Sequence, residues 1–222
     1  MKKKNQICLF VSATALVMFV LWTVAVSLID VNPIGPEGTM VGLSAFNGGF
    51  HNLTGVNMLL YTVTDWLGLV PIFVAFCFAL LGLAQWIKRK KLKNVDTDII
   101  LLGAFYIMVI SVYLLFEFVT VNYRPILINR YLETSYPSST TMLVLTVMPT
   151  ALIQLRSRIK NEFLRNSVIL LICLFVVFMV TGRTVSGVHW LSDIIGGILL
   201  SISLVGLYSF AVGVHQNNDS IA

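Results

Sequence analysis

The chain has 222 residues, of which 57% are hydrophobic and only 11% are charged. An average soluble domain is about 45–50% apolar and about 25% charged, so this composition excludes a disordered chain and argues against a water-soluble globule. The net charge of +5 at pH 7 is expected to reflect the basic loops of a membrane protein rather than a nucleic-acid partner. The sequence therefore predicts a protein of the lipid bilayer that binds no nucleic acid.

Six apolar segments follow one another along the chain, and a helix needs about 20 such residues to cross a bilayer. The segments are 7–29, 66–87, 99–118, 140–155, 167–180 and 190–214. The fourth and fifth are short, so their ends are the least well defined. Because the remaining residues form loops too small to be domains, we predict an all-α fold. It is a single membrane domain, 1–222, of six transmembrane helices with a motif-bearing core at about 97–214.

The first segment follows Met1 and three lysines, which is also how a secretory signal begins. The residues at 25–27 would even be a tolerable cleavage site. However, the apolar run is longer than the 7–15 residues or so that are typical of a signal peptide. We therefore expect an anchor that is not cleaved.

Basic residues predict the orientation of the spans. Twelve of the fifteen Lys and Arg residues lie in three segments, 2–4, 88–93 and 156–165, which six spans place on one side of the membrane. Because cytoplasmic loops are enriched in Lys and Arg, this side is predicted to be the cytoplasm, with both termini on it. The three other basic residues fall on the extracytoplasmic side and need another explanation: Arg124, Arg130 and Arg183.

Residues suited to phosphate binding gather on that extracytoplasmic side. Arg124 follows the third span and Arg183 follows the fifth, and each offers a planar guanidinium that can bind phosphate through two hydrogen bonds. Ser138 and Ser139 begin the fourth span, where backbone N–H groups and the helix dipole favour an anion. The topology predicts that these groups converge.

His189 and Asp193 stand at the start of the sixth span, on the same side. Four residues apart on a helix they share a face, so the carboxylate can fix the imidazole tautomer and leave the other ring nitrogen to attack phosphorus. Taken singly, each polar residue here also has an ordinary role as a helix cap or an interfacial anchor. Their joint position at one membrane face is what favours an active site.

These residues resemble the motifs of the type 2 phosphatidic acid phosphatases, a family of membrane lipid phosphatases. The family pattern K-x6-R-P, P-S-G-H and S-R-x5-H-x3-D corresponds here to Glu117-x6-Arg124-Pro125, Pro137-Ser138-Ser139-Thr140 and Gly182-Arg183-x5-His189-x3-Asp193. The third motif matches in residue type and spacing, whereas the first two match in part. The resemblance extends over most of the chain from the third span onwards.

The resemblance implies a phosphomonoesterase or pyrophosphatase that acts on lipid phosphates without a metal or another cofactor. His189 would be the nucleophile that takes the phosphoryl group, and Asp193 would orient it. Water would then hydrolyse the phosphohistidine. Four residues would hold the phosphate and stabilise the charge of the transition state: Arg124, Arg183, Ser138 and Ser139.

Three departures from the family pattern bear on the chemistry. Glu117 stands where the family has a phosphate-binding lysine, and a carboxylate there repels phosphate unless it pairs with Arg124 or Arg183, or is protonated. Gly182 replaces a serine. Thr140 replaces the histidine that is expected to protonate the leaving group, and a missing general acid typically costs about 10²–10⁴-fold in rate. Because the phosphate of a diphosphate leaves with little help, Thr140 mildly favours a diphosphate substrate.

Several residues on the extracytoplasmic side are alternative proton donors, although each is by itself typical of a loop or surface. They are His51, Asp65, Glu133 and, within the motifs, Glu117. The substrate is left open among polyprenyl diphosphate, phosphatidate, phosphatidylglycerophosphate and a phosphorylated glycolipid. The alternative functions are a family member that binds or moves a lipid phosphate without cleaving it, and an unrelated transporter. We expect a bacterial cell-membrane protein whose site faces outwards; the oligomeric state is not predicted.

Overall fold

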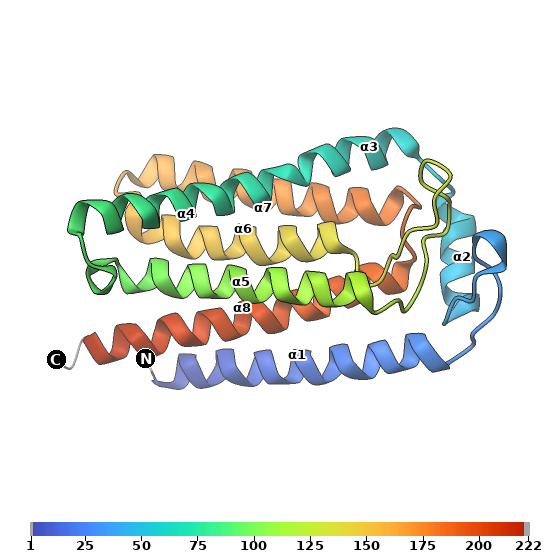
Figure 1. Cartoon of the computed structure of the whole chain (residues 1–222), viewed down its shortest axis with the longest axis horizontal. Coiled ribbons are helices and arrows are strands. Elements are labelled where there is room, and N and C mark those ends of the chain that lie inside the picture. The colour runs from blue at the N-terminus through green and yellow to red at the C-terminus, as the bar shows by residue number, and fades with distance from the viewer. Residues whose placement is uncertain (1, 220–222) are drawn as a thin grey trace.

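Long antiparallel helices dominate the structure, a computed structural model that describes residues 2–219. A shorter helix, α2 (Ser44–Thr54), lies across the end of the bundle opposite both termini (Figure 1). The α3 and α4 helices follow each other at Gly68 as one long rod. The bounds of the long helices are α1 Lys2–Leu28, α3 Met58–Leu67, α4 Leu69–Arg89, α5 Thr97–Phe118, α6 Ser139–Arg158, α7 Glu162–Val185 and α8 Leu191–Asp219.

Five helical segments of the described chain are long and apolar enough to cross a membrane. They are Asn5–Leu28, Met58–Arg89, Thr97–Phe118, Glu162–Val185 and Leu191–Gln216. The predicted all-α membrane bundle is therefore confirmed. The fourth predicted span, 140–155, corresponds to α6, which lies among these helices but is less apolar. The crossing of the bilayer by α6 and the side on which the termini lie remain predictions.

The α6 helix is polar because it faces protein rather than lipid. It contacts α4, α5, α7 and α8 and lies in the middle of the bundle (Figure 1). The buried hydroxyls of Thr146 and Thr150 donate to carbonyls one turn earlier, at 2.7 and 2.8 Å, and Gln154 Nε2 donates to Tyr208 Oη at 2.5 Å. Because these bonds satisfy polar groups away from water, the helix tolerates them. The α6 helix continues to Arg158, beyond the short apolar run at 140–155.

The α1 and α8 helices pack closely through small residues. Ser12 Oγ donates to the carbonyl of Ser203 at 2.7 Å, and a Cβ atom on Gly206 would lie only 2.9 Å from Ser12 Cβ. Small residues of this kind let membrane helices approach each other. The outer faces of the bundle remain apolar, as the strong exposure of Phe10 and Phe73 illustrates. Such side chains are suited to lipid contact.

Near the polar end of the bundle, two helix ends differ from the prediction by five residues or more. The second span begins with α3 at Met58 rather than at residue 66. Asp65, which was predicted to lie before this span, is therefore helical. The α7 helix continues to Val185 rather than 180, so Arg183 lies in its last turn instead of following it. Hydropathy falls before these helices end because polar side chains such as Thr64 and Arg183 are buried between them.

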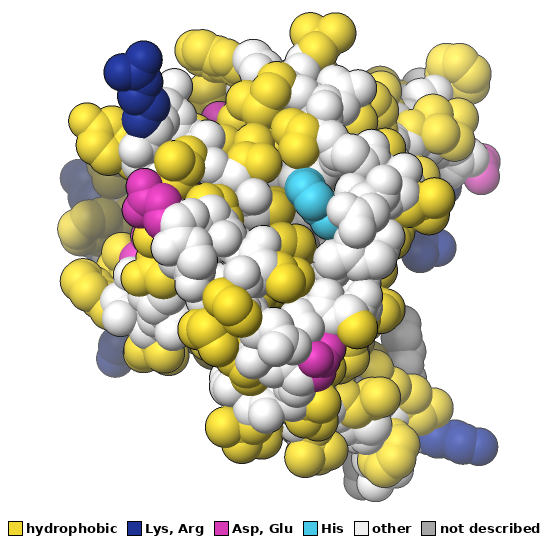
Figure 2. Space-filling view, turned by 90° about the vertical axis from the view of Figure 1, so that its right-hand side faces the viewer, with side chains coloured by type: hydrophobic (Ala, Val, Ile, Leu, Met, Phe, Trp, Pro, Cys, Tyr) yellow, Lys and Arg dark blue, Asp and Glu magenta, His cyan; other side chains and the backbone are white. Residues whose placement is uncertain are grey.

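The two ends of the bundle differ in charge. The basic segments 2–4, 88–93 and 156–165 lie at the end that carries both termini, where Arg89 pairs with Asp96 at 2.7 Å and Arg158 with Asp98 at 2.8 Å. Figure 2 shows the opposite end, where uncharged and hydrophobic side chains cover most of the surface around a histidine. The candidate site lies at this second end.

Candidate active site

The loop after α5 carries Arg124. Hydrogen bonds within the loop, and one from the residue that precedes α8, hold it in place. The backbone N–H of Arg124 donates to the carbonyl of Glu133 at 3.0 Å, and that of Ser135 donates to Asn122 at 2.9 Å, which folds residues 122–135 back on themselves. The indole of Trp190 then donates to the carbonyl of Tyr123 at 2.7 Å. These bonds bring Arg124 beside the residue that precedes Trp190, which is His189.

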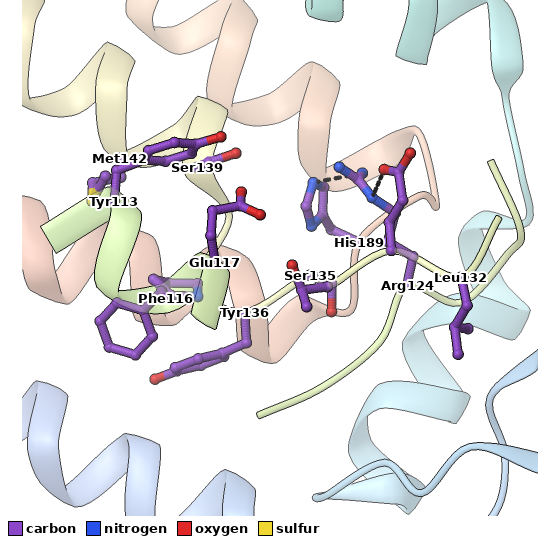
Figure 3. Close-up of a pocket in the computed structure, with 13 residues that line it drawn as sticks. Tyr113, Phe116, Glu117, Arg124, Leu132, Ser135, Tyr136, Ser139, Met142 and His189 are labelled. Carbon is purple, nitrogen blue, oxygen red and sulfur yellow. Dashed lines mark hydrogen bonds and ion pairs between the residues drawn. The ribbon is translucent and has the colours of Figure 1, made fainter. Parts of the chain in front are cut away.

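The imidazole of His189 lies between two guanidinium groups. Its Nε2 atom is 3.1 Å from Arg124 Nη1 (Figure 3). The same atom is 3.2 Å from Nη2 of Arg183. Because arginine only donates hydrogen bonds, Nε2 must be the acceptor and Nδ1 must carry the ring hydrogen. The structure therefore brings the predicted nucleophile and both predicted phosphate-binding arginines together, with the Nε2 lone pair facing the cations.

Burial sets the protonation of this histidine. His189 is 3% exposed, and burial lowers the pKa of its imidazole well below the ordinary value, with the positive charges of Arg124 and then Arg183 lowering the pKa further. A group with a lowered pKa loses its proton more readily, so the imidazole is neutral at neutral pH. Neutral imidazole is the form that can attack an electrophile.

Asp193 lies behind the imidazole, in the first turn of α8. Its Oδ2 atom is 3.7 Å from His189 Nδ1, and it accepts the backbone N–H of Trp190 at 3.0 Å. Because α8 starts at Leu191, His189 precedes the helix, and the prediction that the pair shares a helical face is wrong. Asp193 is the third residue of the helix, and its carboxylate reaches back to the N-cap amide as in a capping box.

The α3 helix holds the two arginines from the other side. The ring of Tyr61 lies under both guanidinium groups, with centroid distances of 5.0 Å to Arg183 and 5.9 Å to Arg124. Asp65, one turn further on, places Oδ1 3.4 Å from Arg183 Nη1. The sequence indicated Asp65 as an alternative proton donor but predicted no role for Tyr61. The signal that would have found it is the four-residue spacing from Asp65, which becomes visible once α3 is recognised as a helix.

Close backbone contacts fix α3 against the loop that carries His189. The backbone N–H of Asn57 donates to the carbonyl of Ser186 at 2.9 Å. Gly187 has a φ of 67°, and a Cβ atom there would lie 1.8 Å from the carbonyl oxygen of Gly55. Only glycine allows this approach and this backbone conformation.

The start of α6 places its three polar residues differently. Ser138 is fully buried; its N–H donates to the carbonyl of Asp193 at 3.0 Å, and its hydroxyl bonds with Thr141 Oγ1 at 3.0 Å. The amide of Ser138 is thus engaged in joining α6 to α8. Ser139 faces the cavity beside His189. Thr140 lies against the α3–α4 junction, because a Cβ atom on Gly68 would be 3.3 Å from its methyl group.

A cavity of about 340 Å³ opens beside His189 (Figure 3). Glu117 at the end of α5 lines it, together with Glu133, whose Oε2 atom is 3.0 Å from Arg124 Nε. Glu117 was expected to repel phosphate unless it paired with Arg124 or Arg183. Other carboxylates make these ion pairs: Glu133 pairs with Arg124, and Asp65 pairs with Arg183. Glu117 adds negative charge to a site where the family has a lysine.

Other residues considered from the sequence lie outside this arrangement. His51 belongs to α2, where its ring packs on Trp190 with a centroid distance of 5.4 Å and where burial lowers the pKa of its imidazole. Arg130 is exposed in a tight turn between Ile128 and Tyr131. Among residues 2–219, no group of three or more His, Cys, Asp or Glu side chains is placed to hold a metal ion.

Close packing against α3 explains why Gly182 stands where the family has a serine. A Cβ atom on Gly182 would lie 2.7 Å from Thr64 Cγ2 and 3.6 Å from Leu60 Cδ1. The last turn of α7 therefore approaches α3 so closely that a serine does not fit without displacement. This close packing brings Tyr61 and Asp65 of α3 into contact with Arg183.

Comparison with known proteins agrees with the motifs. The model of the PAP2 superfamily matches residues 117–216, which contain all three motifs. The motif-bearing segment thus matches the PAP2 superfamily, and the resemblance to the type 2 phosphatidic acid phosphatases is confirmed. A search of curated proteins gives no significant match.

The whole chain is similar in fold to a solved structure. This structure is a transmembrane PAP2 type phosphatidylglycerolphosphate phosphatase from Bacillus subtilis, with a TM-score of 0.59 at 16% sequence identity. The likeness covers 94% of this chain and 97% of that chain. At this level of identity it establishes a shared fold, which includes the N-terminal helices outside the superfamily match.

Proposed function

We propose that this protein is a membrane phosphatase that removes phosphate from a lipid phosphate or diphosphate through a phosphohistidine on His189. The observation that carries the proposal is the buried, neutral imidazole whose Nε2 atom lies 3.1 and 3.2 Å from the guanidiniums of Arg124 and Arg183. Phosphate oxygens can replace Nε2 as acceptors for both cations. The lone pair of Nε2 then faces phosphorus, and the cations stabilise the charge of the transition state.

The reaction proceeds in two displacements. In the first, a bond forms between Nε2 and phosphorus while the bond from phosphorus to the leaving oxygen breaks, and the leaving group takes the electron pair. The imidazole becomes positively charged, which the carboxylate of Asp193 near Nδ1 stabilises. In the second, water attacks phosphorus and the electron pair of the Nε2–P bond returns to the ring.

The substrate class follows from where the site lies. The cavity beside His189 is bordered by apolar residues of the bundle, Phe116 and Met142, and by the polar residues Tyr113 and Ser139. A phosphate at the end of an apolar chain fits such a boundary between helices and water. A diphosphate suits the absence of an acidic side chain at Thr140, because its leaving phosphate needs little protonation.

Release of inorganic phosphate tests the proposal. Purified protein should hydrolyse phosphatidate, phosphatidylglycerophosphate or polyprenyl diphosphate in detergent micelles, with no loss of rate in a chelator. His189→Ala should lower the rate by at least about 10³-fold because it removes the nucleophile. Full activity of His189→Ala would overturn the mechanism, and loss of activity in chelator that a divalent ion restores would overturn metal independence.

A second function is favoured by two particular residues. Thr140 offers no good proton donor, and Glu117 lines the cavity where the family has a lysine. Both features suit a protein that binds or moves a lipid phosphate without cleaving it. Wild-type protein that binds a lipid phosphate but releases no phosphate from any of these substrates would support this function instead.

We also propose that the site faces away from the cytoplasm, because the basic segments lie at the opposite end of the bundle. Tyr131, which is 73% exposed, lies at the site end, and Lys160 lies in the loop between α6 and α7 at the other end. In protein without its native cysteines, Tyr131→Cys should react with an impermeant thiol reagent in intact cells. Lys160→Cys should react only after permeabilisation, and the reverse pattern would overturn the orientation.

A further inference from the structure

We propose that Asp65 is the base that activates water for hydrolysis of the phosphohistidine. The inference rests on the proposed function, since it concerns the second displacement of that reaction. The residue that protonates the leaving group in the first displacement can remove the proton of water in the second. Thr140, at the family position for this role, has no group of suitable acidity. Asp65 lies outside the segment that matches the superfamily.

Two contacts place Asp65 on the Thr140 side of the site. Gly68 follows Asp65 by three residues, and a Cβ atom there would be 2.9 Å from the carbonyl oxygen of Asp65 and 3.3 Å from the methyl group of Thr140. The end of α3 and the first turn of α6 are therefore in contact at this point. Asp65 therefore belongs to the turn of α3 that lies next to Thr140.

The carboxylate of Asp65 is one guanidinium away from the nucleophile. Its Oδ1 atom is 3.4 Å from Arg183 Nη1, and Nη2 of the same guanidinium is 3.2 Å from His189 Nε2. Phosphate bound to Arg183 would therefore lie close to the carboxylate. The side chain of Asp65 is 54% exposed although that of Arg183 is only 1% exposed, so water can reach the carboxylate.

The step is balanced within the residues present. Asp65 accepts a proton from water while the water oxygen forms a bond to phosphorus on the side opposite Nε2. The Nε2–P bond breaks and its electron pair returns to His189. Asp65 then releases the proton to solvent, and inorganic phosphate leaves Arg124 and Arg183.

The other acidic groups near the site are placed for different tasks. Glu133 contacts Arg124 through Nε, and its own carbonyl accepts the Arg124 backbone N–H, so it holds the loop in place. Glu117 lines the cavity at the position where the family lysine binds phosphate. His51 packs on Trp190, whose indole holds the loop of Arg124.

Asp65→Asn is the test, with Glu133→Gln as its matched control. Each change replaces a carboxylate that contacts an arginine of the site with an amide of nearly equal size. With polyprenyl diphosphate labelled with ³²P in its terminal phosphate, the leaving group needs little protonation in the first displacement. Asp65→Asn should then slow steady-state turnover by about 10²–10⁴-fold, release about one equivalent of polyprenyl phosphate in a burst, and retain acid-labile ³²P on the protein. Glu133→Gln should raise KM without retaining label.

Several outcomes decide the matter. Turnover at the wild-type rate, or a slow Asp65→Asn protein without retained label, would overturn the role of Asp65. Adding Thr140→His to Asp65→Asn should speed release of the label, and this rescue would also show that the variant is folded. If the double variant is folded but keeps the label, the result would count against a shared role of positions 65 and 140 in proton transfer. Failure of the proposed function looks different, because no variant would acquire label and His189→Ala would match the wild type.

Discussion

The two halves of the chain contribute to the site in different ways. The half that matches the superfamily, residues 117–216, supplies the groups that would touch phosphate, namely Arg124, Arg183 and His189. The N-terminal half supplies the groups behind them, the ring of Tyr61 and the carboxylate of Asp65. The groups that would touch phosphate thus lie in the motifs, whereas α3, which carries no motif, supplies the groups beside the two arginines, including the proposed base Asp65.

The reason for this division is the cost of burying a cation. Taking a guanidinium out of water is unfavourable unless it is paired and hydrogen-bonded. Arg183 is almost fully buried, and it finds an anion in Asp65, an aromatic face in Tyr61 and an acceptor in His189 Nε2. Two of these three partners belong to α3, so the geometry of the motif depends on how α3 docks.

Among the further variants that probe this division, the one with the largest expected effect lies in the motif-bearing half. Arg183→Ala removes a buried guanidinium that would bind the phosphate, and loss of one such donor lowers kcat by about 10²–10³-fold. Arg130→Ala, an exposed arginine at the same end of the bundle, is the matched control and should stay within about twofold of the wild type. Phosphate release in micelles measures both, and equal losses would show that the effect is one of general surface charge.

The sequence was enough to predict the bundle and the meeting of the motifs at one end. Apolar runs indicate helices wherever a helix faces lipid, and the uneven distribution of basic residues distinguishes the two ends. The prediction was wrong at the ends of α3 and α7 because a helix that buries Thr64 or Arg183 against another helix no longer looks apolar. Hydropathy records contact with lipid, not contact between polar helix ends.

The site was predictable only where a residue has a chemical signature. The spacing of Arg183, His189 and Asp193 identified the reactive groups. Tyr61 had no such signature, because an aromatic residue near the membrane surface is usually an interfacial anchor. The contact between Gly182 and Thr64 was likewise hidden, since a glycine in place of a serine is only a missing hydroxymethyl group until the neighbouring helix is placed.

The docking of α3 on α7 can be broken at that contact. Gly182→Ser restores the family residue but places a Cβ atom 2.7 Å from Thr64 Cγ2, so it should destabilise the protein by about 1–3 kcal/mol and lower activity as α3 shifts. Adding Thr64→Ser removes only that methyl group and should recover much of the loss. Thermal unfolding in detergent measures the effect. The control is Gly103→Ser, where a Cβ atom meets nothing within 4 Å.

The smallest expected effect tests the contribution of α3 that the sequence did not reveal. Tyr61→Leu keeps an apolar side chain but removes the ring under the two guanidiniums. A cation–π contact contributes about 0.5–2 kcal/mol, which corresponds to a loss of about 2–30-fold in kcat/KM. Tyr61→Phe keeps the ring and should lose less than Tyr61→Leu. If the two variants lose activity equally, the hydroxyl rather than the ring positions the arginines; if neither loses activity, the motif-bearing half holds its cations without Tyr61.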